Sequence, residues 1–212
     1  MFENARTENL FSTPLARFKV AEHTVLDAAL LAEGARLRAL DEGVQKSNRG
    51  GWHSEGNLFD NPAASIQQLR DTAIGAIHDA TRAIGSKVDL ESLNLKISGW
   101  MNANPQGGFN APHTHPGAHW SGVYYVSQPA VEEGNSGMIE FLDPRSDLPN
   151  WRILRAKPFR PKRKIRPEAG EMILFPSYLV HWVYPNEAEH ERVTIAFNAT
   201  FGKKRRAQDD AS

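Results

Sequence analysis

The chain has 212 residues, 40% of them hydrophobic, with 25 basic and 25 acidic residues. This composition excludes a disordered or fibrous chain, and a formal net charge of zero provides no overall field that would indicate a nucleic-acid-binding or membrane-surface protein. Because cysteine is absent, disulfides, thiolate zinc sites, iron–sulfur clusters and cysteine nucleophiles are excluded, and any metal must be held by histidine and carboxylate groups.

The first residues show neither a basic start nor an apolar segment typical of a secretory signal. No apolar run approaches the roughly 18 residues that a membrane-spanning helix needs. We therefore expect a cytoplasmic protein that makes no membrane contact. Basic residues do cluster at 157–166 and 203–206, and the simplest interpretation of both clusters is a solvated face or tail.

The first part of the chain has helical periodicity. Apolar residues recur on one face over 24–40, which predicts an amphipathic helix. A second helix is predicted to open at Asn61 as its N-cap, with Pro62 in the first turn, and to stop at Gly85. The segment 47–60 between them is polar and rich in glycine, so it is either a plain connector or a lid.

From about residue 90 the pattern becomes that of short β-strands separated by Pro and Gly. Because helices come first and strands second, we expect an α+β layout in which the helices pack on one face of an antiparallel sandwich or barrel. We expect a single domain with a helical part over 1–90, a β core over 91–202 and a flexible tail over 203–212. The predicted strands are 93–101, 121–127, 137–142, 171–175, 179–184 and 192–201.

Three histidines form a candidate metal site. His113 and His115 are two residues apart, so on a strand both imidazoles point to the same side. His181, on a later strand, can supply a third ligand. Iron(II) that activates oxygen needs three protein ligands on one face of its octahedron, because the other positions are needed by co-substrate and oxygen. His119 is a competing ligand, although the Pro-Gly turn before it favours an outward direction.

Arg192 opens the last predicted strand and is a candidate for binding a co-substrate carboxylate. An α-keto acid that chelates the metal leaves its far carboxylate in need of a cation, and the planar guanidinium fork of arginine matches a carboxylate. A tyrosine hydroxyl can add a second donor to the same group.

Residues 93–201 resemble the double-stranded β-helix (jelly-roll, cupin-like) core of the iron(II)/2-oxoglutarate oxygenases, in the prolyl-hydroxylase-like branch. The stretches NAPHTHPGAHWSGVYYV, GEMILFPSYLVHWVYPN and RVTIAFN resemble a family of 2-oxoglutarate oxygenases known mainly from sequence surveys. The family pattern is His-x-Asp/Glu, a distal His, and then Arg or Lys. His113 and His181 match its histidines, whereas His115 stands where the family has a carboxylate.

The resemblance also implies residues that bind 2-oxoglutarate. Arg192 matches the basic residue that holds its carboxylate, and Tyr124 matches the tyrosine that bonds the same group. Asn102 and, more loosely, Asn110 lie where related sites place polar co-substrate contacts. The implied protein is a hydroxylase-type dioxygenase that uses Fe(II), 2-oxoglutarate and O2, and that oxidises a small-molecule or peptide substrate while 2-oxoglutarate is converted to succinate.

Two alternatives stay open at this point. One is a three-histidine non-haem metalloenzyme that does not use 2-oxoglutarate, and the other is a non-catalytic jelly-roll binding module whose histidines line a ligand pocket. An exposed strand edge in such a core often pairs, so a homodimer is a further expectation.

Overall fold

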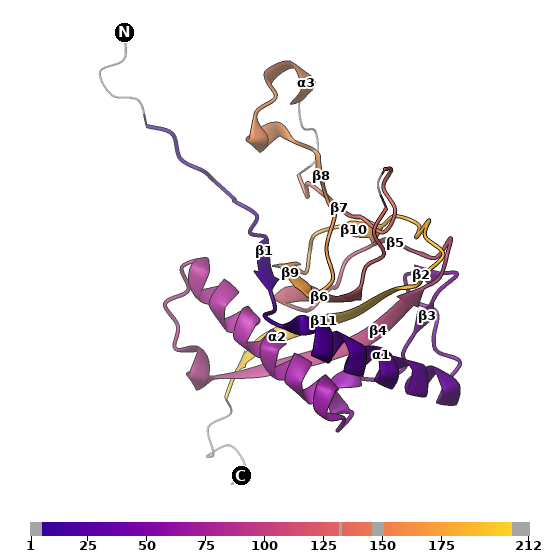
Figure 1. The fold of residues 1–212 in the computed structure, drawn as a ribbon. Coiled ribbons are helices and arrows are strands. Elements are labelled where there is room, and N and C mark those ends of the chain that lie inside the picture. Colours follow the sequence, from indigo (N-terminus) through magenta and orange to yellow (C-terminus); the bar gives the residue numbers. More distant parts are fainter. Residues whose placement is uncertain (1–5, 132, 146–150, 205–212) are drawn as a thin grey trace.

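The computed structural model describes residues 6–131, 133–145 and 151–204 (Figure 1). Two long helices precede most of the strands, as the helical and β patterns predict. In chain order the elements are β1 (Ala16–Lys19), α1 (His23–Leu40), β2 (Asn48–Arg49), β3 (Trp52–His53), η1 (Leu58–Asp60), α2 (Ala64–Ala83), η2 (Leu90–Ser92), β4 (Leu93–Asn104), β5 (Phe109–His113), β6 (Trp120–Ser127), β7 (Ile139–Leu142), α3 (Trp151–Leu154), η3 (Lys157–Phe159), β8 (Lys162–Ile165), β9 (Glu171–Pro176), β10 (His181–Val183) and β11 (Arg192–Lys203).

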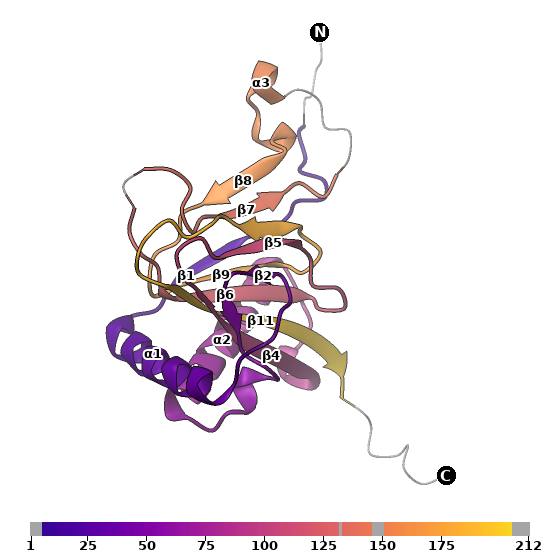
Figure 2. The ribbon, with the colours of Figure 1, turned by 90° about the vertical axis from the view of Figure 1, so that its right-hand side faces the viewer.

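The strands form two antiparallel sheets. The larger sheet has the order β1-β9-β6-β11-β4-β3, and the smaller one has the order β2-β5-β10-β7-β8. Figure 2 shows α1 and α2 on one face of the larger sheet and the smaller sheet on its other side. This arrangement is the double-stranded β-helix with helices on one face, so the predicted α+β fold class is confirmed.

Two layers of buried apolar side chains hold the three layers together. One lies between the helices and the larger sheet and includes Leu30, Ile77 and Phe197. The other lies between the two sheets and includes Phe141 and Phe175. A central strand of the larger sheet therefore has no solvent-facing side, which explains why β6 is buried over nearly its whole length and does not alternate apolar with polar residues.

Helix α2 begins later than the sequence predicts. It starts at Ala64, and no side chain caps it, because its N-cap residue is Ala63. The Asn61 Oδ1 accepts a hydrogen bond from the Ala63 N–H at 2.9 Å, and its Nδ2 donates to Glu33 of α1 at 2.6 Å. Asn61 therefore organises the turn and ties the two helices together, whereas the predicted N-cap position is wrong.

The segment predicted as a connector or lid is bonded into both sheets. Strand β2 pairs with β5 of the smaller sheet, and β3 pairs with β4 of the larger sheet. The Asn48 side chain is buried and accepts from the Lys46 N–H at 2.7 Å, while its Nδ2 donates to the carbonyls of Gly51 at 2.8 Å and Val44 at 3.2 Å. This segment thus bridges the edges of the two sheets.

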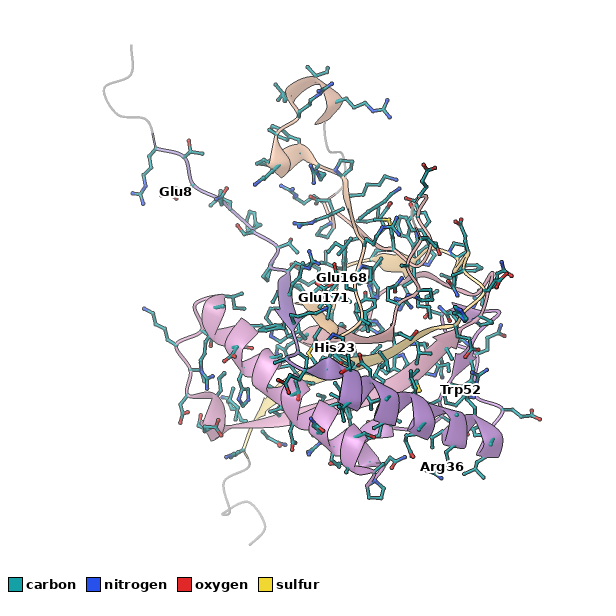
Figure 3. All side chains as sticks on the ribbon, viewed as in Figure 1. Glu8, His23, Arg36, Trp52, Glu168 and Glu171 are labelled. Atoms are coloured by element: carbon teal, nitrogen blue, oxygen red, sulfur yellow. The ribbon has the colours of Figure 1, made fainter. Side chains whose placement is uncertain are left out.

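A buried polar chain joins helix α1 to the larger sheet. The Tyr124 hydroxyl donates to Asp27 Oδ1 at 2.6 Å, and the His23 Nδ1 lies 2.6 Å from Asp27 Oδ2. Figure 3 shows His23 where α1 meets the sheet. Burial, followed by the hydrogen bond to Asp27, raises the pKa of Tyr124, so its hydroxyl stays protonated and remains a donor.

None of the helices in the described ranges is both long enough and apolar enough to span a lipid bilayer.

We expect Tyr124→Phe to lower the free energy of unfolding by about 1–3 kcal/mol, because it leaves a buried carboxylate oxygen of Asp27 without a donor. Urea unfolding followed by circular dichroism measures the change. Tyr178→Phe is the matched control, since Tyr178 is 54% exposed and should change stability little. Equal effects of the two substitutions would contradict a stabilising role for the Tyr124–Asp27 bond.

Candidate metal centre and co-substrate pocket

The structure brings His113, His115 and His181 together. His113 ends β5 and His181 begins β10, and these two residues are direct partners in the pairing of the two strands. His115 follows the end of β5, where its N–H donates to the Ser177 carbonyl at 3.0 Å. One nitrogen from each of the three rings lies within 4.8 Å of the others. Such spacing is compatible with a single ion coordinated by three imidazoles.

Backbone carbonyls fix the tautomers of two of these histidines. The His113 Nδ1 lies 2.7 Å from the Ala111 carbonyl, and the His181 Nδ1 lies 2.9 Å from the Leu179 carbonyl. A carbonyl only accepts, so each Nδ1 carries the proton and each Nε2 keeps its lone pair. Outer hydrogen bonds of this kind orient histidine ligands in metal sites.

The outer partner of His115 is different. Its Nδ1 lies 3.4 Å from the side-chain amide of Asn198 on β11, and that amide also bonds the Ser121 hydroxyl at 2.8 Å. An amide presents either a donor or an acceptor, depending on which way it is turned. With its oxygen toward His115, Asn198 accepts from Nδ1–H and leaves Nε2 unprotonated, as in the other two histidines.

Burial keeps the three imidazoles neutral. Desolvation, with a contribution from the neighbouring His113, lowers the pKa of His115 to about 4 and that of His181 to about 3. Desolvation also lowers the pKa of His113. Neutral imidazole is the form that binds metals, so the site is ready to bind at neutral pH. The cluster contains no carboxylate, so the chemistry of the donor set is that of three neutral nitrogen ligands.

Arg192 is a buried cation in the same cavity as the histidines. It is 1% exposed, its Nε donates to Gln128 Oε1 at 3.0 Å, and its guanidinium lies over the Tyr125 ring at 5.2 Å. Within the described ranges no Asp or Glu forms an ion pair with it. Burial lowers the pKa of this guanidinium, which reflects the cost of keeping it charged without a counter-ion.

Two more polar groups in this cavity lack partners. The Tyr125 hydroxyl and the Asn102 Oδ1 are buried and form no hydrogen bond within the described structure. Burying such groups unpaired costs roughly 1–3 kcal/mol each. The cavity that they share has a volume of about 40 Å³ and lies between the histidines and Arg192. An unpaired cation and two unpaired polar groups around one cavity are the features of a site built for an anionic, hydrogen-bonding ligand.

The structure places Tyr124 outside this cavity. Successive residues of a strand point to opposite faces, and Tyr124 faces the helices while Tyr125 faces the cavity. The expected proximity of Tyr124 to the metal and Arg192 is therefore wrong, and Tyr125 is the tyrosine beside the guanidinium. The sequence VYYV contains both residues, and the spacing alone does not decide which one faces inward.

The other predicted residues are distributed as follows. Asn102 and Asn110 line the cavity, in agreement with their expected place beside the histidines. His119 lies elsewhere, and its Nδ1 accepts from the Phe201 N–H at 3.2 Å, so it does not compete as a ligand. Gln128 was missed, because a glutamine at a strand end carries no sequence pattern that would identify it.

Comparison with known proteins agrees with this geometry. Residues 98–198 match a family model described as "Putative 2OG-Fe(II) oxygenase". No curated protein sequence matches the chain. The matched segment and the fold, which the prolyl hydroxylases share, agree with the resemblance to the iron(II)/2-oxoglutarate oxygenases recognised in the sequence.

Solved structures with this fold include proteins of several kinds. A prolyl-4-hydroxylase from Pseudomonas putida is 16% identical with a TM-score of 0.63, over 92% of this chain and 95% of that one. A Trichoplax adhaerens prolyl hydroxylase bound to a peptide of hypoxia-inducible factor is 14% identical with a TM-score of 0.64, over 88% and 83% of the two chains. HygX from Streptomyces hygroscopicus, with nickel, 2-oxoglutarate and hygromycin B bound, is 13% identical with a TM-score of 0.61, over 89% and 83%.

We expect metal affinity to change by less than about fivefold between pH 8 and pH 6. The pKa of His113 is lowered, and His115 and His181 bind protons only near pH 4 and pH 3, so protons compete little with the metal above pH 6. Three histidines of ordinary pKa would lose roughly 70-fold over the same range, because each proton competes with the metal. Anaerobic titration with cobalt(II) at both pH values measures the ratio, and a loss near the larger figure would contradict the lowered pKa values.

Proposed function

We propose that the protein is an iron(II)- and 2-oxoglutarate-dependent oxygenase of the hydroxylase type. His113, His115 and His181 hold the metal, and Arg192 holds the distal carboxylate of 2-oxoglutarate. The observation that carries this proposal is the buried guanidinium of Arg192, which shares a cavity with the three histidines and has no described carboxylate partner. The fold and the matched family support the same reading.

The polar groups of the cavity fit this co-substrate. A carboxylate facing Arg192 neutralises the buried charge and can accept a second bond from the Tyr125 hydroxyl. Burial raises the pKa of Tyr125 to about 12, so it remains a donor at neutral pH. The Asn102 side chain offers a further polar contact in the same cavity.

The bound metal and 2-oxoglutarate together supply the oxidising chemistry, in which O2 gives one oxygen atom to succinate and one to the substrate. The protein orients the histidine ligands and surrounds part of the cluster with apolar side chains. Phe175 and Phe141 pack against the ring of His181, with centroids 4.7 and 5.9 Å away, and these apolar contacts exclude water from that side of the cluster. Carbonyl contacts hold His113 and His181 in one tautomer each.

His115 also favours a second candidate function. Its neutral imidazole stands where the family pattern has a carboxylate, so the metal keeps one more unit of positive charge. Three-histidine sites also serve metalloenzymes that do not use 2-oxoglutarate. Arg192 distinguishes the two candidate functions, because only a 2-oxoglutarate-dependent enzyme would supply a carboxylate to pair with its buried charge.

We expect the protein to bind one iron(II) per chain and to develop a visible metal-to-ligand band when 2-oxoglutarate is added without oxygen. His181→Ala should abolish the band, because it removes the most buried ligand of the cluster. Anaerobic absorption titration measures both. Iron binding by the wild type without a band would favour the second candidate, and stoichiometric iron in the variant would remove His181 from the ligand set.

We expect Arg192→Ala to weaken 2-oxoglutarate binding by at least roughly tenfold, since a charge-assisted hydrogen bond contributes about 1.5–3 kcal/mol. Arg192→Lys should retain part of the affinity, because it keeps the charge but loses the planar fork. Tyr124→Phe is the control for an altered core and should leave the affinity unchanged. Wild-type affinity in Arg192→Ala would remove this residue from co-substrate binding.

The cytoplasmic location and the homodimer stay predictions.

A further inference from the structure

A second, wider cavity adjoins the histidines on the outside. Its volume is about 580 Å³, against about 40 Å³ for the inner one, and both are lined by Ser47, Trp100, His113 and His115. The outer volume lies in the range of small-molecule sites, roughly 300–1,000 Å³. A substrate bound in this outer cavity would lie beside His113 and His115, which are two of the three proposed metal ligands.

Two cations stand on the wall of the outer cavity. Lys46 and Arg49 both line it, both are exposed, and neither forms an ion pair with a described residue. No described Asp or Glu lines either cavity. In a chain with equal numbers of basic and acidic residues, this one-sided lining creates a local positive field at the entrance.

The backbone that carries the two cations is fixed. The buried Asn48 between them bonds the Lys46 N–H, and the Ala111 N–H of β5 donates to the Ser47 carbonyl at 2.9 Å. The Arg49 guanidinium is steadied by the carbonyls of Lys46 and Asn48, at 2.9 and 2.8 Å. These carbonyls take bonds from one Nη1, so other donors of the fork remain for a ligand.

The opposite wall is aromatic. The rings of Trp100 and His53 stack with centroids 5.7 Å apart and planes 9° apart, and Trp100 reaches His115 at 5.5 Å. The His53 Nδ1 is bonded to the Ser54 carbonyl, and burial lowers the pKa of His53, so this ring is neutral. The wall therefore offers a flat, uncharged surface that leads from the cations to the histidines.

We infer that the substrate is a small anionic molecule, with a carboxylate or phosphate held by Lys46 and Arg49 and an apolar or planar body along Trp100. The inference rests on the proposed function, because it assumes that the substrate reacts at a metal held by the three histidines. It is strengthened by His115, because a divalent metal held by three neutral imidazoles and the Arg192 guanidinium together carry one more charge than doubly negative 2-oxoglutarate neutralises, so the site keeps a net positive charge beneath the substrate. A cationic substrate would be repelled from both ends.

The test uses three probes of matched shape: 3-phenylpropionate, phenyl phosphate and the neutral 3-phenylpropionamide. Binding to the full chain, loaded with zinc(II) and saturating 2-oxoglutarate and also metal-free, is followed by ligand-observed NMR. We expect at least one anion to bind roughly fivefold or more tightly than the amide, and to weaken as salt is raised. Which anion binds better separates a carboxylate substrate from a phosphate substrate.

The double variant Lys46→Met/Arg49→Met should weaken the preferred anion by roughly three- to tenfold, as expected for two partly screened ion pairs. Lys87→Met/Arg70→Met removes the same charges from α2 and the loop after it, and should leave binding unchanged. Equal binding of amide and anions, equal losses in both double variants, or no binding of either anion would overturn the inference.

A further titration distinguishes a failure of the proposed substrate class from a failure of the proposed oxygenase function. Iron(II) and 2-oxoglutarate titration of Lys46→Met/Arg49→Met should give the wild-type visible band, because neither residue lines the inner cavity. A normal band without anion preference would reject only the substrate class. Anion preference that depends on Lys46 and Arg49, in a protein that shows no band, would reject only the oxygenase function.

Discussion

The alternation of side chains along the central strands of the larger sheet determines where every group of the site lies. Strands β6, β11 and β4 pair in register over long stretches, so Tyr125, Thr194 and Asn102 are brought to one face, and Arg192 lies on that face two residues before Thr194. The opposite face carries Tyr124 and Phe197 into the helix layer. Because the period is two residues, a shift of one position would exchange the metal cavity with the helix-packing surface.

The smaller sheet supplies the histidines of the candidate metal site. Its strands β5 and β10 place His113 opposite His181 in direct pairing, and the chain after β5 returns His115 to the same point. The three histidines therefore come from the smaller sheet and the chain after β5, whereas Arg192, Tyr125 and Asn102 come from the larger sheet. Each sheet contributes neutral or positive groups, so the charge balance of the cavity depends on the ligands that enter it.

Much of this could be predicted from the sequence. The apolar periodicity located both long helices, and the strand pattern located six of the strands, which are β4, β6, β7, β9, β10 and β11. The short strands β1, β2, β3 and β8 were missed, because two to four residues provide too little periodicity to distinguish a strand from a loop. The sequence pattern correctly predicted that His113, His115 and His181 meet, although β5 ends at His113 and His115 is positioned by the chain after the strand.

The sequence could not decide between the two adjacent tyrosines. Tyr124 and Tyr125 are both completely buried, so neither residue type nor hydrophobicity separates them. Only the pairing of Thr194 with Tyr125 shows which one faces the cavity. The hydrogen bond between Arg192 and Gln128 was equally hidden, because it joins residues 64 positions apart in the chain.

The bridging segment has a consequence for how the entrance can move. Lys46 and Arg49 flank a residue whose strand is bonded to the smaller sheet, while Trp52 and His53 are bonded to the larger one. A flap hinged at one end could swing aside at little cost, but this segment is attached on both sides. The width of the entrance is therefore set by the distance between the two sheets. Such a pre-formed entrance admits molecules that already fit it and does not open to accommodate larger ones.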